Sequence, residues 1–139
     1  MAQREEGQNL ERLFTLAEAN RLIPQLQRHL AAVKQAKAVL IRTKNEIKKA
    51  SSKAALGGGS FAGPHYITSL EEISENLEAI QELGVLVKDL DTGLCDFPHM
   101  LNGRIVYLCW KLGETEVQWW HEVNTGYMDR QPLDQELDH

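Results

Sequence analysis

The side chains best suited to chemistry lie in the last third of the chain, among residues with the composition of β-strands. Carboxylates and imidazoles alternate there with several bases. The set is Lys88, Asp89, Asp91, Asp96, His99, Arg104, Glu114, His121 and Arg130. Because carboxylate oxygens and imidazole nitrogens ligate divalent metals, the set predicts a binding site or a metal site. The structural alternative is a buried Asp–His or Asp–Arg pair that serves only the fold.

Three short motifs in this stretch resemble those of known sites, and each departs from its pattern. Asp91-Thr92-Gly93 is the tripeptide of aspartic proteases, but the faint second motif, Leu101-Asn102-Gly103-Arg104, follows far too soon. Asp89-x-Asp91-x-Gly93 begins like a calcium loop, yet its glycine comes one place early and no glutamate occupies the twelfth position. His121-Glu122 begins like a zincin helix, but the second histidine is missing. A hairpin turn with Gly93 in the left-handed region explains the tripeptide better.

For Asp89, the position in the sequence predicts both the burial of the side chain and its need for a partner. If Asp91-Thr92-Gly93 is a three-residue loop, the strands on either side pair in a fixed register. The predicted pairs are Leu90 with Leu94, Asp89 with Cys95, Lys88 with Asp96, and Val87 with Phe97. Lys88 and Asp96 then form a cross-strand ion pair. Asp89 lies on the apolar face of Val85 and Val87, so its carboxylate is expected to be at least partly buried. It then needs a cationic partner, for which His121, Arg104 and Arg130 are the candidates.

The elements that must position these residues are short strands. β-branched and aromatic residues follow Gly84 and are interrupted by turn signals such as Asn102-Gly103. We predict three or four antiparallel strands, at Val85–Leu90, Leu94–Phe97, Arg104–Leu112 and Val117–Val123. The last segment also fits a helical face, and the acidic tail from Asp134 is expected to fray.

Two helices are predicted before the strands. Thr15 and Glu18 form a capping box, and an apolar seven-residue series follows, which predicts a helix from Leu16 to Ser51 with a kink at Pro24. Residues 55–64 are rich in glycine and predict a loop. Ser69 and Glu72 form a second capping box, which predicts a helix from Leu70 to Leu83. Antiparallel pairing of these helices should bring one apolar series onto the other. The two series are Leu26, Val33, Leu40 and Ile47, and Leu70, Ile73, Leu77 and Ile80.

Charge separates between the two predicted helices. The segment from Arg28 to Lys53, which holds the end of the first helix, carries eight bases against the single acid Glu46, and the second helix carries glutamates and no base. A basic run raises the hypothesis of nucleic-acid binding. Pairing of the basic helix with the acidic one explains the pattern better, although each exposed pair contributes only about 0.5 kcal/mol. We therefore expect no nucleic-acid partner.

Length and composition indicate the number of domains, the state of the cysteines and the location of the protein in the cell. The chain has 139 residues and a formal net charge of −5, which fits one domain with a core of its own. Cys95 and Cys109 form no C-x-x-C motif, so free buried thiols are expected rather than a disulfide framework. The segment Met1 to Asn9 lacks a signal-peptide core, and no stretch is long and apolar enough for a membrane span. We expect a cytoplasmic protein.

Several blocks of the sequence resemble a known family, the bacterial domain-of-unknown-function family 2203. These blocks are Phe14-Thr15-Leu16-x-Glu18-Ala19-Asn20-x-Leu22-Ile23-Pro24, Gly84-Val85-Leu86-Val87-Lys88-Asp89-Leu90-Asp91-x-Gly93-Leu94-x-Asp96-Phe97-Pro98, Leu108-Cys109-Trp110-Lys111-Leu112-Gly113-Glu114, Trp120-His121-Glu122 and Gly126-Tyr127-x-x-Arg130-x-Pro132. The resemblance implies a small bacterial protein but carries over no catalytic role. It directs attention to the strand-rich half.

The sequence thus predicts an α+β fold, a long antiparallel helical hairpin followed by a small antiparallel sheet. The first functional hypothesis is a non-enzymatic binding or assembly protein that acts as a homodimer, because both faces of the first hairpin carry apolar residues. The second is a metal-dependent hydrolase or similar enzyme. The candidate binding site comprises Asp89, Asp91, Asp96, Arg104, Trp110, Glu114, His121 and Arg130. The candidate ligands of a divalent metal are Asp89, Asp91, His99 and His121.

Overall fold

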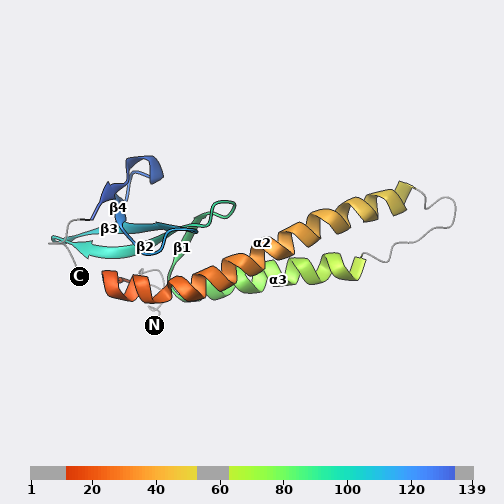
Figure 1. Cartoon of the computed structure of the whole chain (residues 1–139), viewed down its shortest axis with the longest axis horizontal. Helices are drawn as coiled ribbons and strands as arrows, with labels where there is room; N and C mark the ends of the chain where they lie inside the picture. Colours follow the sequence, from red (N-terminus) through yellow and green to blue (C-terminus); the bar gives the residue numbers. More distant parts are fainter. Residues whose placement is uncertain (1–11, 53–62, 134–139) are drawn as a thin grey trace, which may run out of the picture. The chain divides into compact units, whose positions relative to one another are not determined.

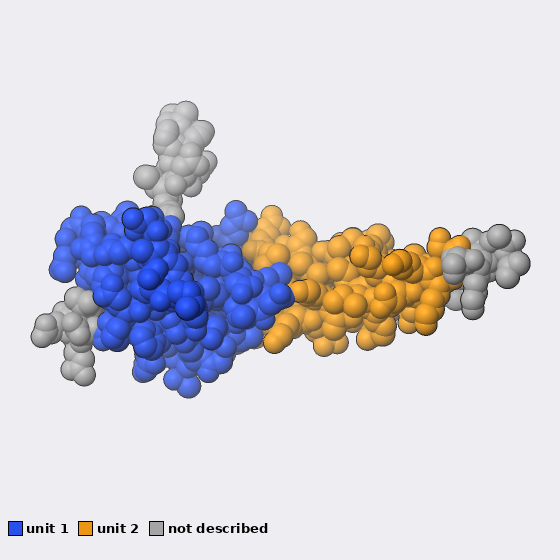
Figure 2. Space-filling model, turned by 90° about the horizontal axis from the view of Figure 1, so that it is seen from above, with its two compact units in different colours: residues 1–27, 80–139 blue, residues 28–79 orange. Residues whose placement is uncertain are grey.

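The structure, a computed structural model, describes residues 12–52 and 63–133. It shows the expected α+β fold, with helices first and an antiparallel sheet after them (Figure 1). The chain divides into two compact units, residues 28–79 and the remainder, residues 1–27 with 80–139 (Figure 2). In the described part of the chain, no helix has an apolar stretch that could cross a bilayer.

Helix α2 spans Leu16–Ser52, one residue beyond the predicted end. Its capping box forms as predicted. The Thr15 amide donates to Glu18 Oε1 at 2.9 Å, and the Glu18 amide donates to Thr15 Oγ1 at 3.0 Å. Pro24 lies inside the helix, which continues through it. The kink at Pro24 stays a prediction.

Helix α3 spans Gly63–Glu82 and so begins seven residues before the predicted start at Leu70. Pro64 lies in its first turn, where a missing amide donor costs nothing because that amide has no helical acceptor. The capping box predicted at Ser69 and Glu72 was wrong, since Ser69 is a buried residue within the helix. Of the predicted loop, residues 55–62 lie outside the described residues, and Gly63 and Pro64 belong to α3.

Within the unit of residues 28–79, α2 and α3 lie side by side (Figure 1). A hydrogen bond of 2.8 Å joins His29 Nδ1 to Asn76 Oδ1, and Val33 is buried while Ile73 is half-buried. Leu70 is 42% exposed, so its predicted place in the apolar contact was wrong. Ser69, the residue before Leu70 in α3, takes the buried position instead. Pairing of the lysines with the glutamates stays a prediction.

The sheet has five antiparallel strands in the order β1-β2-β3-β4-β5, against the three or four predicted. The strands are β1 Leu86–Asp89, β2 Leu94–Leu101, β3 Arg104–Lys111, β4 Trp119–Glu122 and β5 Gln131–Pro132. The segment Val117–Val123 therefore contains a strand and not a helix. β5 was missed because a strand of two residues carries no alternation pattern.

The register predicted for the first hairpin was wrong. Leu86 pairs with Asp96, Val87 with Cys95 and Asp89 with Leu94, with a bulge between Val87 and Asp89. Gly93 does adopt a left-handed conformation, with φ 70°. Leu86, and not Lys88, therefore lies opposite Asp96, although Lys88 still acts electrostatically on the Asp96 carboxylate.

The second hairpin sets the two faces of the sheet. Leu101 pairs with Arg104 across Asn102-Gly103, and β2 and β3 remain in register for eight pairs. Since side chains alternate along a strand, each residue of a pair shares a face with its partner. The polar face carries Asp96 and Pro98 of β2, Tyr107, Cys109 and Lys111 of β3, and Trp119 and His121 of β4. The packed face carries Cys95, Phe97 and His99 of β2, Val106, Leu108 and Trp110 of β3, and Trp120 and Glu122 of β4.

The packed face meets the segment that leads into α2. The rings of Phe14 and Phe97 lie 5.3 Å apart, edge to face, and the Phe14 amide donates to the Pro98 carbonyl at 2.7 Å. Gly84 has a left-handed φ of 91°, and a Cβ there would lie 3.0 Å from Arg12 Cβ. Only glycine therefore suits this approach of the chain to the sheet.

Candidate metal centre on the sheet

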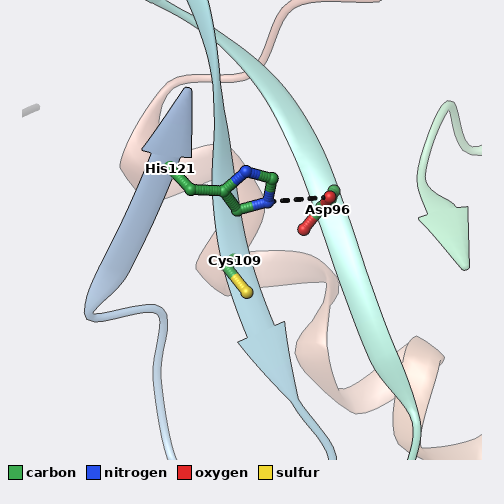
Figure 3. Close-up of side chains that lie close together, drawn as sticks. All are labelled: Asp96, Cys109 and His121. Carbon is green, nitrogen blue, oxygen red and sulfur yellow. Dashed lines mark hydrogen bonds and ion pairs between the residues drawn. The ribbon is translucent and has the colours of Figure 1, made fainter. Parts of the chain in front are cut away.

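Three buried side chains with metal-ligating atoms meet on the polar face of the sheet. Asp96 and Cys109 are direct partners across β2 and β3. His121 lies on β4 opposite Tyr107, two residues from Cys109 along β3, so its ring can reach across Cys109 (Figure 3). One carboxylate oxygen, the thiol sulfur and one imidazole nitrogen all lie within 4.8 Å of one another. Three adjacent strands thus contribute one ligand-type atom each.

The contacts of His121 fix the orientation of its ring. Its Nε2 lies 3.0 Å from Asp96 Oδ2, and its Nδ1 lies 2.8 Å from the carbonyl oxygen of Glu122. Because a carbonyl only accepts, Nδ1 carries the proton in that contact. Nε2 points at Asp96 Oδ2, and that hydrogen bond needs one proton between the two atoms, which a metal bound to Nε2 would replace. A backbone carbonyl on the far nitrogen is the arrangement commonly found around metal-ligating histidines.

Asp96 is a carboxylic acid in a buried environment, which disfavours its charged form. The residue is 1% exposed, and its Oδ1 has no hydrogen-bond partner among the residues that the structure describes. Burial raises the pKa of the carboxyl group above its usual range, and His121 first, then Lys88 and the Cys109 thiol, oppose that rise. A buried carboxylate oxygen without a partner is costly, so this atom has capacity for a further ligand.

Cys109 is a free, buried thiol, as is Cys95, which confirms the expectation for both. Burial first, and then the Asp96 charge, raise the pKa of the Cys109 thiol to about 12, while Arg130 acts in the opposite direction. The thiol is therefore protonated near neutral pH and is a poor nucleophile as it stands. A bound cation would change this, because metals bind the thiolate and displace its proton.

Three cations surround this centre, each held over an aromatic ring. Lys88 Nζ lies 5.3 Å from the centre of the Tyr107 ring, and Lys111 Nζ lies 5.0 Å from that of Tyr127. The guanidinium of Arg130 lies 4.7 Å from the Trp119 ring and 4.3 Å from the Tyr127 ring. Such contacts hold a positive charge in place beside an apolar surface.

Arg130 contacts one of the ligand residues of the centre directly. Its Nη1 donates to Glu114 Oε2 at 3.1 Å and lies 3.9 Å from Cys109 Sγ. Glu114 in turn accepts from the Lys111 amide at 2.9 Å. Arg130 and Glu114 thus form an ion pair at the edge of the buried centre. Both residues belong to the candidate site that the sequence indicated.

Asp89 and Asp91 lie away from the centre, in and next to the first turn. The predicted burial of Asp89 was wrong, because the residue is exposed. Its carboxylate accepts from the Asp91 amide at 3.2 Å and from the Thr92 hydroxyl at 3.1 Å. The bulge after Val87 changes the side of the sheet on which Asp89 lies, and its carboxylate then stabilises the turn. Asp96, and not Asp89, is the partner of His121.

The remaining predicted site residues lie on the packed face. His99 Nδ1 lies 2.7 Å from the Phe14 carbonyl oxygen, so His99 and His121 occupy opposite faces of the sheet. Arg104 forms an exposed pair with Glu122, with 2.6 Å between Nη2 and Oε2. The Trp110 indole donates to the Glu114 carbonyl at 2.9 Å. The four predicted metal ligands therefore do not converge, and Trp110 has a structural contact.

Sequence reasoning missed Cys109 as a site residue, although a signal for it existed. Asn102-Gly103 is a strong two-residue hairpin signal that pairs Leu101 with Arg104. Counting outward from that pair aligns Asp96 with Cys109. The strand predicted from Leu94 to Phe97 stops short of this hairpin, whereas β2 continues to Leu101. Lys88, Lys111 and Tyr127 became neighbours of the centre only through the folded sheet and the chain that follows it.

Comparison with known proteins adds one finding. The model of the family described as "Uncharacterized conserved protein (DUF2203)" matches residues 12–133. Neither the curated proteins nor the solved structures contain a match. The matched range includes Asp96, Cys109 and His121 as well as the cations around them.

Proposed function

This chain belongs to the DUF2203 family of uncharacterized conserved proteins, and we propose that it is a metal-binding protein with Asp96, Cys109 and His121 as ligands. The proposal keeps the first hypothesis from the sequence, a binding protein, and takes the divalent metal from the second. The ligands differ from those that the sequence suggested, with His121 common to both sets.

One observation carries the proposal, the convergence of three different ligand atoms at a buried point. The donor atoms lie within 4.8 Å of one another, and all three residues are buried. The buried Asp96 Oδ1, with no hydrogen-bond partner among the described residues, supports it independently. A buried Asp–His pair that serves only the fold does not explain the carboxylate oxygen that lacks a hydrogen-bond partner in the described part of the chain.

The kinds of donor atom favour a transition metal. Calcium and magnesium select oxygen atoms, whereas thiolate and imidazole together favour Zn²⁺ and related ions. Three protein ligands leave one position of a tetrahedral Zn²⁺ site open to a small ligand. We therefore propose one Zn²⁺-type site in each chain.

Metal uptake is the direct test. We expect the metal-free protein, dialysed against Co²⁺ or Zn²⁺, to take up one equivalent, measured by elemental mass spectrometry. Co²⁺ should also produce the near-ultraviolet absorption of a thiolate–cobalt bond. Cys109→Ser should lose that band and most of the uptake, because the hydroxyl is a far weaker ligand.

Cys95→Ser is the matched control, since Cys95 is the other buried thiol but lies on the packed face of the sheet. It should retain the band and the stoichiometry. Equal uptake by wild type and Cys109→Ser would contradict the proposal, as would protein that takes up no metal at all.

Self-association is a second, separate proposal. Leu86, Leu90 and Leu94 are half-buried in the chain, and β1 is an edge strand. A partner that covers them would remove apolar surface from water. We expect sedimentation velocity to show a dimer with a largely apolar interface. A strict monomer at high micromolar concentration would refute it.

A further inference from the structure

We propose that this centre binds a small oxyanion, a phosphate or carboxylate group, in contact with both the metal and Arg130. The inference rests on the proposed metal site and specifies its ligand class. It comes from the charges around Asp96, Cys109 and His121, which the metal ligands themselves do not require.

The cations near the centre come from three separate parts of the chain. Lys88 belongs to β1, Lys111 to β3, and Arg130 directly precedes β5. The aromatic rings below two of them, Tyr107 and Trp119, lie on the polar face of the sheet. The fold therefore gathers positive charge on the face that carries the buried ligands. Such a surface attracts anions and raises their local concentration.

Most of this positive charge is not used in ion pairs within the described contacts. Lys111 Nζ donates to the Tyr127 hydroxyl at 3.0 Å and lies over the same ring. Lys88 lies over Tyr107. Only Arg130 has a carboxylate partner among these contacts, Glu114 at 3.1 Å. Lys88 also acts electrostatically on Asp96, so an anion at this place would meet the cations that are not held in a direct ion pair with a described residue, Lys88 and Lys111.

The Arg130 side chain has hydrogen-bond donors that are available to such an anion. Its side-chain hydrogen bonds to described residues start from Nη1. A guanidinium presents five N–H donors in a rigid plane, so Nε and Nη2 remain as donors for a ligand. The guanidinium also lies over the Trp119 ring at 4.7 Å and over the Tyr127 ring at 4.3 Å, and these contacts restrict its movement. Fixed, planar donor pairs match the oxygen atoms of phosphate and carboxylate groups.

The Arg130 guanidinium lies beside the position proposed for the metal. Arg130 Nη1 lies 3.9 Å from Cys109 Sγ, one of the three ligand atoms. A ligand at the open position of the metal would therefore lie within reach of the guanidinium. Metal and guanidinium together would hold one oxyanion from two sides.

The test uses the full-length protein loaded with Co²⁺, whose visible spectrum reports on the ligands of the ion. Inorganic phosphate and acetate are titrated separately at constant ionic strength. We expect at least one of them to change the spectrum saturably, and the anion that does so identifies a phosphoryl or a carboxylate ligand.

Arg130→Gln should weaken that binding about ten-fold, because a charge-assisted hydrogen bond is lost. Lys88→Gln, an exposed position, should weaken it about three-fold by reducing the local potential.

Arg104→Gln is the matched control. Arg104 also lies over a tryptophan, 5.9 Å from the Trp120 ring, and also pairs with a glutamate, but on the packed face. This variant should bind the anion as the wild type does. An equal loss in Arg104→Gln would overturn the inference, because it would indicate diffuse charge rather than a site.

The outcomes separate this inference from the proposed function. Normal Co²⁺ loading with a spectrum that neither anion changes would overturn the inference and leave the metal site intact. Failure to load Co²⁺ would overturn the metal site and the inference with it. If Arg130→Gln does not fold, as judged by circular dichroism, Lys88→Gln and Arg104→Gln still decide between the outcomes.

Discussion

His121→Leu is expected to lower the free energy of unfolding of the metal-free protein by about 3–5 kcal/mol, the usual cost of breaking a buried ion pair. Asp96 and His121 are 1% and 3% exposed, and 3.0 Å separates Oδ2 from Nε2. Without the imidazole, the carboxylate loses its hydrogen-bond partner on Oδ2, and Oδ1 already has none in the described structure. Urea denaturation of both proteins in chelator-treated buffer measures the difference.

The double variant Asp96→Val with His121→Leu is the control. Replacing both members of a buried pair by apolar residues is often neutral, so most of the lost stability should return. A double variant as unstable as His121→Leu would mean that packing, and not the unpaired carboxylate, causes the loss. A change below about 1 kcal/mol in His121→Leu would contradict the importance of the pair.

The loss in His121→Leu should depend on pH in a defined direction. Burial raises the pKa of Asp96 above 3.8, and His121 opposes that rise, so its removal should raise the pKa further. An acid whose pKa is higher in the folded state binds more protons when folded. Its contribution is therefore fully present below pH 3.8 and is lost as the pH rises through the folded pKa. The difference in stability between single and double variant should thus grow from acid toward neutral pH.

Zinc is expected to stabilise the protein strongly. At a free Zn²⁺ concentration of about 1,000 times Kd, the free energy of unfolding should rise by about 4 kcal/mol, provided that the unfolded chain does not bind the ion. Thermal unfolding with and without Zn²⁺ measures this. Cys109→Ser should lose the stabilisation, whereas Cys95→Ser should keep it. Stabilisation of all three proteins to the same degree would indicate binding elsewhere.

The zinc effect should increase with pH. The Cys109 thiol, whose pKa is raised to about 12, keeps its proton near neutral pH in the metal-free protein. Binding must therefore release at least that proton, so the affinity should rise about ten-fold for each pH unit. A Zn²⁺ affinity that is constant between pH 6 and 8 would show that the thiol is not a ligand.

Local signals in the sequence predicted the elements well. The reciprocal hydrogen bonds between Thr15 and Glu18 form as expected, because a capping box involves only neighbouring residues. Gly93 adopts its left-handed turn for the same reason.

The predicted start of α3 was wrong because two signals for a helix start lie close together. Pro64 and Ser69 both suit a first turn, and only the burial of Ser69 in the folded chain decides between them.

The candidate centre depended on the register between strands, which a sequence specifies less directly. A shift of one residue moves a side chain to the other face of a sheet. The bulge after Val87 makes such a shift, so the predicted site centred on Asp89 was wrong and Asp96 became the partner of His121. β2 also continues beyond its predicted end at Phe97, through Pro98, whose carbonyl accepts from the Phe14 amide.

The sequence by itself therefore determined the α+β class, the capped first helix, the free thiols, and a strand-rich half that holds the reactive side chains. Only the tertiary structure decided which of those side chains meet. Asp96, Cys109 and His121 are up to 25 residues apart along the chain, and three strands bring them together. Arg130 reaches Cys109 because the chain after β4 turns back before β5 pairs with β4. Helix caps and turns arise from interactions between near neighbours, whereas a site built across strands exists only once the register of every strand between its members is set.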